Sequence, residues 1–344
     1  MALKARIEIE TRARTFASGL LLDIVAALRE TAGGDLVAIT ADDPAVGRDL
    51  EIWSRLTRNP IVGVTSANGR TRWVFRHGSP PGEAEPVRPL GARLWLYTNF
   101  DCNLRCDYCC VRSSPTSSRR ELGLGLVRRV VSEARSLGLE QLFVTGGEPF
   151  LLPDIAPILR ACADAAPTTV LTNGMLFRGG RLEALRALPR DRVTLQISLD
   201  SPSPELHDRH RGHGTWERAW AGIDTARREG FRVRLAATVS TDDEAERFAE
   251  FLDRNAVDPD DRVIRRLALR GFAEDGVALS RADLVPEVTV TARGVYWHPV
   301  GADDDDFIVT RDVLPLAAAL DAVRAALERE REHATRVASV FHCA

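Results

Sequence analysis

The stretch CNLRCDYCC, residues 102–110, places four cysteines in one short loop directly after the apolar run LWLY. Cys102, Cys106 and Cys109 have the spacing C-x3-C-x2-C. Thiolates this close together cannot all pair with one another in a reducing compartment, so a soft metal centre is their natural partner. Four-cysteine iron–sulfur clusters and structural zinc sites both require a fourth protein ligand. A loop of three thiolates therefore predicts a metal centre with one open coordination position.

Cys110 leaves a second interpretation open, because it could complete a four-thiolate zinc site. A zinc loop, however, predicts nothing about three further motifs downstream. GGEP (146–149), TNG (172–174) and ISLDS (197–201) each follow a predicted strand. Taken in this order with the cysteine loop, they resemble the radical S-adenosylmethionine (SAM) superfamily from residue 93 to about residue 269, roughly half of the chain.

The resemblance implies a [4Fe-4S] cluster held by Cys102, Cys106 and Cys109, with SAM bound to the open iron. One electron, from a donor such as flavodoxin or ferredoxin, would cleave SAM to methionine and a 5′-deoxyadenosyl radical. That radical would abstract hydrogen from a small-molecule or peptide substrate, which the motifs do not specify. The protein would hold SAM and the substrate in register and exclude water.

The same resemblance implies a SAM site at the strand ends. Paired glycines allow the backbone to approach a ligand closely, and a hydroxyl and a carboxylate on one face of a strand suit two ribose hydroxyls. Thr-Asn-Gly is also ordinary turn chemistry, so the asparagine depends on the resemblance. The residues implied in cofactor binding are Tyr108, Gly146, Gly147, Glu148, Asn173, Ser198, Asp200 and Thr238.

The stretch HDRHRGHGTWERA, residues 207–219, is expected to be a loop that leads into a helix. Arg209 or Arg211 would offer a bidentate fork to the methionine carboxylate of SAM or to a substrate carboxylate. His210 and His213 are expected to be solvated loop residues.

Composition bounds the class of protein. A chain of 344 residues with 44% apolar and 28% charged residues is ordinary globular material, and its net charge of −3 gives no reason to expect nucleic acid or an anionic membrane as a partner. Six cysteines, four of them in one loop, do not form a secreted disulfide framework. The N-terminus has no apolar signal core and no apolar run reaches membrane-spanning length, so we expect a cytoplasmic protein.

Residues 1–78 are expected to form a separate α+β domain of order βαβαββ. The first helix is predicted to bury the face formed by Leu21, Ile24, Val25 and Leu28, and to stop at the glycine pair 33–34. Strands are expected at 5–11, 36–40, 61–65 and 71–75, and a second helix is expected to follow Asp43-Pro44 and to bury Val46, Leu50 and Trp53. Asn68-Gly69 predicts a hairpin turn between the last two strands.

This domain resembles the TusA-like sulfur carriers, which work through a cysteine near the start of the first helix. Here the corresponding stretch reads FASGLLLD, and no cysteine precedes Cys102. Persulfide carriage is therefore not expected, since only a thiolate can carry the sulfur. A scaffold, or a surface that docks a partner or a substrate, is the expected role. Four prolines lie between residues 78 and 91, so residues 79–92 are expected to be an extended linker.

Residues 93–270 alternate strands and helices, and near-continuous apolar strands favour a parallel sheet covered by helices. Six repeats are too few for a closed barrel, and the family resemblance implies an open, partial (β/α)6 barrel whose chemistry gathers at the carboxyl ends of the strands. Strands are expected at 94–99, 141–145, 168–172, 193–199, 232–239 and 262–269. Helices are expected at 121–137, 154–163, 181–188, 215–229 and 243–255.

Residues 271–344 form a C-terminal extension, with strands expected at 287–291 and 295–297 and an amphipathic helix at 314–330. The four carboxylates at 303–306 have poor spacing for calcium and are expected to form a solvated acidic loop. Cys162 is expected in the core. Cys343 is either an incidental terminal thiol, a late hydrogen-atom donor or sulfur-handling residue, or the remnant of a cysteine-rich extension.

Three functions remain open at this point. A radical SAM enzyme acting on a small molecule or peptide explains the ordered motifs. A sulfur-inserting radical SAM enzyme would need a partner that donates sulfur, because residues 1–78 contain no thiol. A non-enzymatic iron–sulfur or zinc protein that docks a sulfur-relay partner leaves GGEP and ISLDS unexplained.

Overall fold

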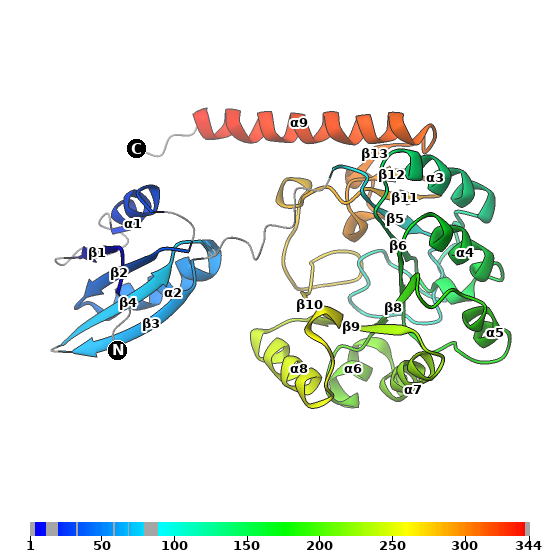
Figure 1. Cartoon of the computed structure of the whole chain (residues 1–344), viewed down its shortest axis with the longest axis horizontal. Helices are drawn as coiled ribbons and strands as arrows, with labels where there is room; N and C mark the ends of the chain where they lie inside the picture. Colours follow the sequence, from blue (N-terminus) through cyan, green and yellow to red (C-terminus); the bar gives the residue numbers. More distant parts are fainter. Residues whose placement is uncertain are drawn as a thin grey trace. The chain divides into compact units, whose positions relative to one another are not determined.

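The computed structural model describes residues 4–11, 20–31, 34–57, 59–67, 69–78 and 89–340. The chain forms two compact units, Met1–Arg88 and Pro89–Ala344 (Figure 1). Most of the expected linker lies outside the described residues, as do Asn68 and Cys343. Across the described ranges, no helix combines the length and the apolar character needed to cross a membrane.

The N-terminal unit has the predicted order βαβαββ. Its sheet has the strand order β1-β2-β4-β3, with β1 parallel to β2 and the other neighbours antiparallel. Gly69 has a φ of 76°, which glycine adopts without strain in the predicted hairpin turn between the last two strands. The elements are β1 (Ile7–Glu10), α1 (Leu20–Arg29), β2 (Leu36–Ala41), α2 (Pro44–Thr57), β3 (Ile61–Ala67) and β4 (Arg70–Arg76).

The buried face of α2 is the predicted one, since Val46, Leu50 and Trp53 are all buried and the helix begins at Pro44. The predicted face of α1 is partly wrong. Leu20 and Ile24 are fully buried, whereas Leu21 and Val25 remain 38% and 37% exposed. The helical period places the buried face at positions 20, 24 and 27, one residue earlier than the sequence suggested, because three consecutive leucines made the two faces indistinguishable.

The second unit is built on a nine-stranded sheet with the order β10-β9-β8-β7-β6-β5-β11-β12-β13. The six strands expected for the barrel pair in parallel, which confirms the predicted α/β fold. They are β5 (Arg93–Tyr97), β6 (Gln141–Thr145), β7 (Thr168–Thr172), β8 (Val193–Ser198), β9 (Arg232–Val239) and β10 (Arg262–Arg266). The helices between them are α3 (Leu124–Ser136), α4 (Ile155–Ala165), α5 (Gly180–Arg186), α6 (Pro204–Arg211), α7 (Thr215–Arg228) and α8 (Asp242–Arg254).

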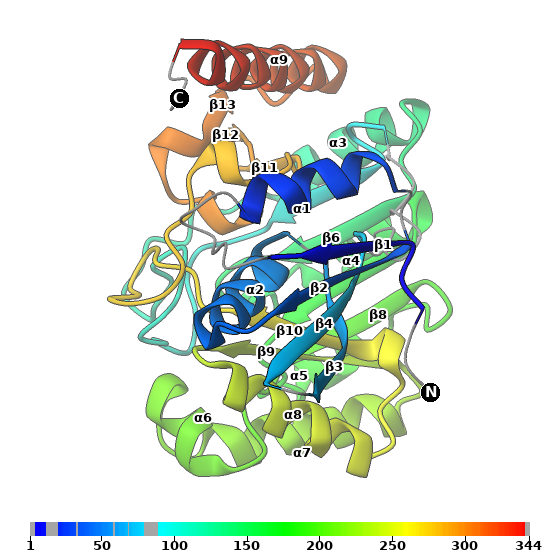
Figure 2. The same ribbon diagram turned by 90° about the vertical axis from the view of Figure 1, so that its left-hand side faces the viewer.

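Alternation along the strands separates a core face from an inner face. On β9, Val233, Leu235 and Ala237 point to the hydrophobic core that the strands share with the helices. Thr238 lies on the opposite face, where side chains from several strand ends meet. Helices α6, α7 and α8 lie side by side along the β8–β10 end of the sheet (Figure 2). The sheet therefore presents an inner face whose polar residues are gathered at one edge.

The predicted helix at 215–229 is confirmed by α7, but the loop expected before it is partly wrong, because residues 207–211 belong to helix α6. Helix α6 ends at Arg211, and α7 begins only four residues later. Ser203-Pro204 is a helix-start signal that the sequence analysis did not use. The segment PELHDRHR is so polar that no apolar periodicity marks it as a helix. In this described segment, His207 is the one buried side chain.

The C-terminal segment extends the sheet beyond β5. Strand β11 (Thr289–Thr291) pairs in parallel with β5, and β12 (Gly294–Tyr296) and β13 (Ile308–Thr310) add antiparallel strands. The two predicted strands are confirmed, and β13 was missed. Helix α9 (Leu316–Val340) confirms the predicted helix and runs ten residues past its expected end. The start of α9 packs through Leu316, Leu320 and Val323 on the hydrophobic core that the sheet shares with its helices.

The acidic loop at residues 303–306 is not simply solvated, which corrects the prediction. Asp303 lies 2.6 Å from Arg120 and 3.5 Å from Arg112, both in the loop that follows β5. Two of its neighbours are also paired, at 2.5 Å each: Asp304 with Arg270 and Asp305 with Arg293. The sequence could not show these pairs, because the partners of Asp303 lie more than a hundred residues away. The carboxylates tie the C-terminal segment to the cysteine-bearing part of the chain.

Two helical glycines test how closely the second unit is packed. A Cβ at Gly222 of α7 would lie 2.0 Å from the carbonyl oxygen of Gly174, whereas a Cβ at Gly125 of α3 would meet open space. We expect Gly222→Ala to destabilise the protein by about 1–3 kcal/mol, because backbone must move. Gly125→Ala should be neutral or stabilising by up to about 1 kcal/mol. Thermal unfolding followed by circular dichroism measures both, and equal midpoints for the two variants would contradict the packing.

Candidate active site

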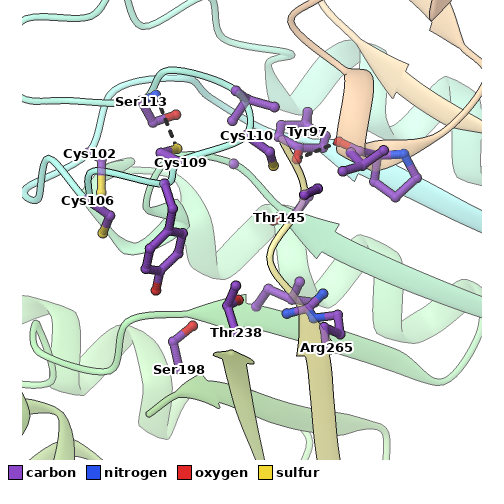
Figure 3. Close-up of a pocket in the computed structure, with 18 of the residues that line it drawn as sticks. Tyr97, Cys102, Cys106, Cys109, Cys110, Ser113, Thr145, Ser198, Thr238 and Arg265 are labelled. Atoms are coloured by element: carbon purple, nitrogen blue, oxygen red, sulfur yellow. Dashed lines mark hydrogen bonds between the residues drawn. The ribbon is translucent and has the colours of Figure 1, made fainter. Parts of the chain in front are cut away.

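A cavity of about 390 Å³ opens at the carboxyl edge of the parallel strands (Figure 3). Its wall is formed by the cysteine loop, by the ends of β5 to β10 and by parts of the C-terminal segment. Most of the residues that the sequence singled out meet here, although they are spread over more than 130 positions. Those on the wall are Cys102, Cys106, Tyr108, Cys109, Gly146, Gly147, Asn173, Ser198, Arg211 and Thr238.

The three thiols lie in a loop that orients them by backbone hydrogen bonds. The N–H of Leu104 donates to Cys102 Sγ at 3.4 Å, and the N–H of Ser113 donates to Cys109 Sγ at 3.3 Å. Burial raises the pKa of the Cys106 thiol to about 11. Burial raises the pKa of Cys102 as well, and more strongly. Protons would therefore stay on these two thiols at neutral pH unless a cationic centre displaced them.

A polynuclear iron–sulfur cluster fits this donor set. Soft thiolates are its usual ligands, and the charge of the bound iron favours the deprotonated sulfur. Across the described residues, no three His, Cys, Asp or Glu side chains converge closely enough to hold a single metal ion. Thiolates that each bind a different iron do not have to converge on one point. Cys102, Cys106 and Cys109 on one cavity wall are therefore suited to a cluster of several irons.

The two glycines of GGEP are required by packing within the chain. A Cβ at Gly146 would lie 2.3 Å from Asn99 Oδ1, and a Cβ at Gly147 would lie 2.1 Å from the carbonyl oxygen of Asp101. The N–H of Gly147 donates to Asn99 O and the N–H of Glu148 donates to Asp101 O, both at 3.0 Å. The end of β6 is thus joined directly to the segment that enters the cysteine loop. Only glycine permits this approach.

Glu148 is fully buried and is not part of the cavity wall. Its carboxylate accepts hydrogen bonds from the N–H of Phe150 (3.0 Å), the hydroxyl of Thr172 (2.8 Å) and the N–H of Asn173 (2.8 Å). Burial raises its pKa, while these donors act in the opposite direction. The Asn173 side chain in turn donates to Asn103 Oδ1 at 2.9 Å. Glu148 therefore acts as a positioning residue that links the ends of β6 and β7 to the cysteine loop.

Asp200 also lies behind the wall rather than on it. Its carboxylate accepts from the Tyr108 hydroxyl, from Arg211 Nε at 2.5 Å and Nη2 at 3.2 Å, and from the N–H of Thr238 at 3.1 Å. Burial works to raise the pKa of Asp200, but Arg211 outweighs it and the pKa is lowered. The Arg211 guanidinium lies 5.5 Å from the centre of the Tyr108 ring. Asp200 thus orients two side chains that do face the cavity.

The two candidate arginines have different environments. Arg211 is buried and lines the cavity, whereas Arg209 is exposed on α6 and does not. Two residues along an α-helix point in nearly opposite directions, so only one of them can face the site. The sequence did not reveal this choice because it treated the segment as a loop.

Neither His207 nor His210 is a solvated loop residue, which corrects the prediction for His210. His210 Nδ1 lies 2.9 Å from the Asp107 carboxylate in the cysteine loop. His207 is buried and accepts the N–H of Asp200 through Nδ1 at 3.1 Å, and burial lowers its pKa to about 4. His213 is exposed, as expected. Helix α6 therefore contacts the cysteine loop through His210 and Asp107.

Sequence reasoning missed the contribution of the C-terminal segment to the cavity. The hydroxyl of Tyr97 donates to the carbonyl oxygen of Pro299 at 3.0 Å and holds this segment against the end of β5. The wall residues from this segment are Leu279, Leu284, His298, Pro299 and Val300. No motif connects them to the cysteine loop, and only the pairing of β11 with β5 brings them there. Cys162 is fully buried in the core, as predicted.

The buried pair of Asp200 and Arg211 should contribute strongly to stability. We expect Asp200→Asn to cost about 3–5 kcal/mol at pH 7, because it leaves a buried guanidinium without its counter-charge. Since the folded pKa of Asp200 is lowered, this contribution is present above the unfolded pKa and is lost as the pH falls through the folded pKa.

Urea unfolding of the full chain at pH 7 measures this loss. Glu183→Gln is the control, because Glu183 forms an exposed pair with Arg186 that should be worth less than about 1 kcal/mol. A similar small effect for both variants would contradict the assigned role of Asp200.

Part of this chain is similar to known proteins. Residues 96–254 match the model of the radical SAM superfamily. An AdoMet-dependent heme synthase of Methanosarcina barkeri (strain Fusaro / DSM 804) is 37% identical over 141 residues, which cover 40% of this chain and 40% of that protein. A PqqA peptide cyclase of Ruegeria pomeroyi (strain ATCC 700808 / DSM 15171 / DSS-3) is 33% identical over 161 residues, 46% of this chain and 42% of that protein. The chain spans less than half the length of these relatives.

The solved structures agree at the level of the fold. A structure described as native anSMEcpe with bound AdoMet has a TM-score of 0.53 and 12% identity, and covers 66% of this chain and 80% of that one. The family match begins at residue 96, so the resemblance of residues 1–78 to TusA-like carriers stays a prediction. The cysteine loop, the strand-end motifs and the parallel half-barrel all lie in the matched part of the chain, and residues 96–254 are a radical SAM domain.

Proposed function

We propose that this protein is an enzyme that binds a [4Fe-4S] cluster and SAM in the cavity and generates a radical there. The observation that supports this function is that three cysteines and five strand-end motif residues line one cavity, within a radical SAM domain. When bound, the cluster supplies the electron that splits SAM into methionine and a 5′-deoxyadenosyl radical, which takes hydrogen from a substrate.

The cysteine loop would hold the cluster through Cys102, Cys106 and Cys109. Its position is fixed from two sides, by the backbone contacts of Gly147 and by the contact of Asp107 with α6. Preorganisation of this kind matters because a reactive radical must form within reach of one chosen C–H bond.

SAM would lie along the strand ends. The hydroxyl of Ser198 and the amide of Asn173 are polar wall groups at the ends of β8 and β7, suited to ribose and to the methionine part. Tyr108 would face the adenine. Asp200 occupies one edge of the Arg211 guanidinium, through Nε and Nη2, and so orients the group as a donor for the SAM carboxylate.

The substrate would enter beside SAM, where the C-terminal segment completes the wall with Leu284 and Val300. The cavity volume of about 390 Å³ is in the range of small-molecule sites, and a peptide side chain would also fit. We further propose a flavodoxin or ferredoxin as electron donor. Residues 1–78 would serve as a scaffold or as a docking surface for a partner, since they contain no thiol.

Loss of one cluster ligand should abolish the reaction. We expect Cys106→Ala to bind less iron and sulfide after anaerobic reconstitution and to release no 5′-deoxyadenosine from SAM above background. Cys162→Ala is the matched control, because Cys162 is buried in the core away from the cavity and should keep both properties. Normal release of 5′-deoxyadenosine by Cys106→Ala would refute the proposed function.

Ser198 provides a test of where SAM binds. We expect Ser198→Ala to raise the Kd of SAM by about two- to tenfold, because one hydrogen bond is lost from a site that stays folded. Calorimetric titration of SAM into the reconstituted, unreduced protein measures the change. Thr225→Ala serves as control, since its hydroxyl donates to Ala221 O and accepts from Arg228, both within α7. Unchanged affinity in Ser198→Ala would place SAM elsewhere on the wall.

A further inference from the structure

The cavity wall has an uneven charge composition. Within the described residues 89–340, the wall includes Arg211, Arg265 and Arg266 but no aspartate or glutamate. His298 is the histidine on this wall. It is uncharged at neutral pH, because burial lowers its pKa to about 4. The cavity is therefore electropositive before SAM or a substrate binds.

Two of the three arginines have a counter-charge nearby. Arg211 pairs with the buried Asp200, and Arg266 lies 3.0 Å from Asp242 at the start of α8. In the part of the chain that the structure describes, the Arg265 guanidinium has neither an ion pair nor a hydrogen bond, while its backbone belongs to the β9–β10 ladder. A guanidinium without a partner in a largely apolar cavity is a group that favours an anionic ligand.

Arg265 lies on β10, the edge strand of the sheet, where its exposed side chain lines the cavity. It is the register partner of Thr238 on the neighbouring strand β9, and Figure 3 shows it beside Thr238 in the cavity. Its charge also reaches across the cavity to Tyr97 on β5: burial raises the pKa of Tyr97, and Arg265 acts against that rise. Arg265 thus faces the same space as the cysteine loop.

The surrounding charges add to this field. Burial lowers the pKa of Arg234 on β9, and the charges of Arg93 and Arg265 act in the same direction, opposed by Asp261. Several cations therefore lie along the inner face of the sheet. The cavity wall also carries apolar side chains, which include Trp95, Tyr97, Leu267, Leu279, Leu284 and Val300. This combination suits a ligand with an apolar body and one anionic group.

We propose that Arg265 binds an anionic group, a carboxylate or a phosphate, on the substrate of this enzyme. The inference rests on the proposed function in one respect, namely that the cavity holds a substrate beside SAM. Arg211 then serves SAM and Arg265 serves the substrate, within one cavity. The planar fork of arginine would orient the substrate as well as attract it, and so select which C–H bond faces the radical.

The test uses ligand pairs that differ in charge but little in shape. Indole-3-acetate, indole-3-acetamide and phenyl phosphate are titrated into the full chain, reconstituted anaerobically and saturated with SAM, and binding is followed by calorimetry. The wild type should bind at least one of the two anions about tenfold or more tightly than the amide. Preference for indole-3-acetate identifies a carboxylate site, and preference for phenyl phosphate identifies a phosphate site.

Variants of Arg265 test whether this residue causes the preference for an anion over the amide. Arg265→Gln should remove the preference, and Arg265→Lys should keep part of it, because a point charge remains without the fork. Arg262→Gln is the matched control on the same strand and should keep the preference, since Arg262 pairs with Asp253 and does not line the cavity. Equal affinity for anion and amide in the wild type, undetectable binding of both anions, or an unchanged preference in Arg265→Gln would overturn the inference.

Two readouts separate this inference from the proposed function. No reductant is present in the titrations, so they do not depend on cleavage of SAM, which is measured separately as release of 5′-deoxyadenosine. The Kd of SAM is also measured for each variant. If Arg265→Gln loses affinity for SAM while the anion preference persists, then Arg265 binds the SAM carboxylate and the inference is wrong.

Discussion

The site depends on one close contact, in which the end of β6 packs directly on the segment that enters the cysteine loop. Gly146 and Gly147 leave no space for a side chain, because Asn99 and Asp101 fill the positions where their Cβ atoms would lie. Backbone hydrogen bonds then fix the loop to the strand ends. A loop bearing three thiols is thereby held in one place without relying on the metal it is suited to bind.

Buried charged groups extend this framework from one strand to the next. Glu148 connects the ends of β6 and β7, and Asp200 connects β8 and β9 with Tyr108 and Arg211. Each carboxylate has its oxygens occupied by donors from the chain, which offsets the cost of burying it. Their role is therefore to orient the groups that face the cavity, and Arg265 differs from them in having no such partner among the described residues.

The C-terminal segment completes the cavity wall with residues that belong to none of the strand-end motifs. It is joined to the barrel through the pairing of β11 with β5, the bond from Tyr97 to Pro299 and the ion pairs of Asp303. The radical SAM domain ends before this segment begins. The part of the wall that would contact a substrate is thus supplied outside the shared domain, as expected where one scaffold serves different substrates.

The sequence by itself determined the alternation of strands and helices, the cysteine loop and the order of the strand-end motifs, because these follow from local periodicity and from residues close in the chain. It also indicated which wall residues belong together through the motifs. Only the tertiary structure decided that Asp200 and Glu148 lie behind the wall, that Arg211 rather than Arg209 faces the cavity, and that Arg265 stands there unpaired. Those outcomes depend on register and on partners far away in sequence, which no local pattern contains.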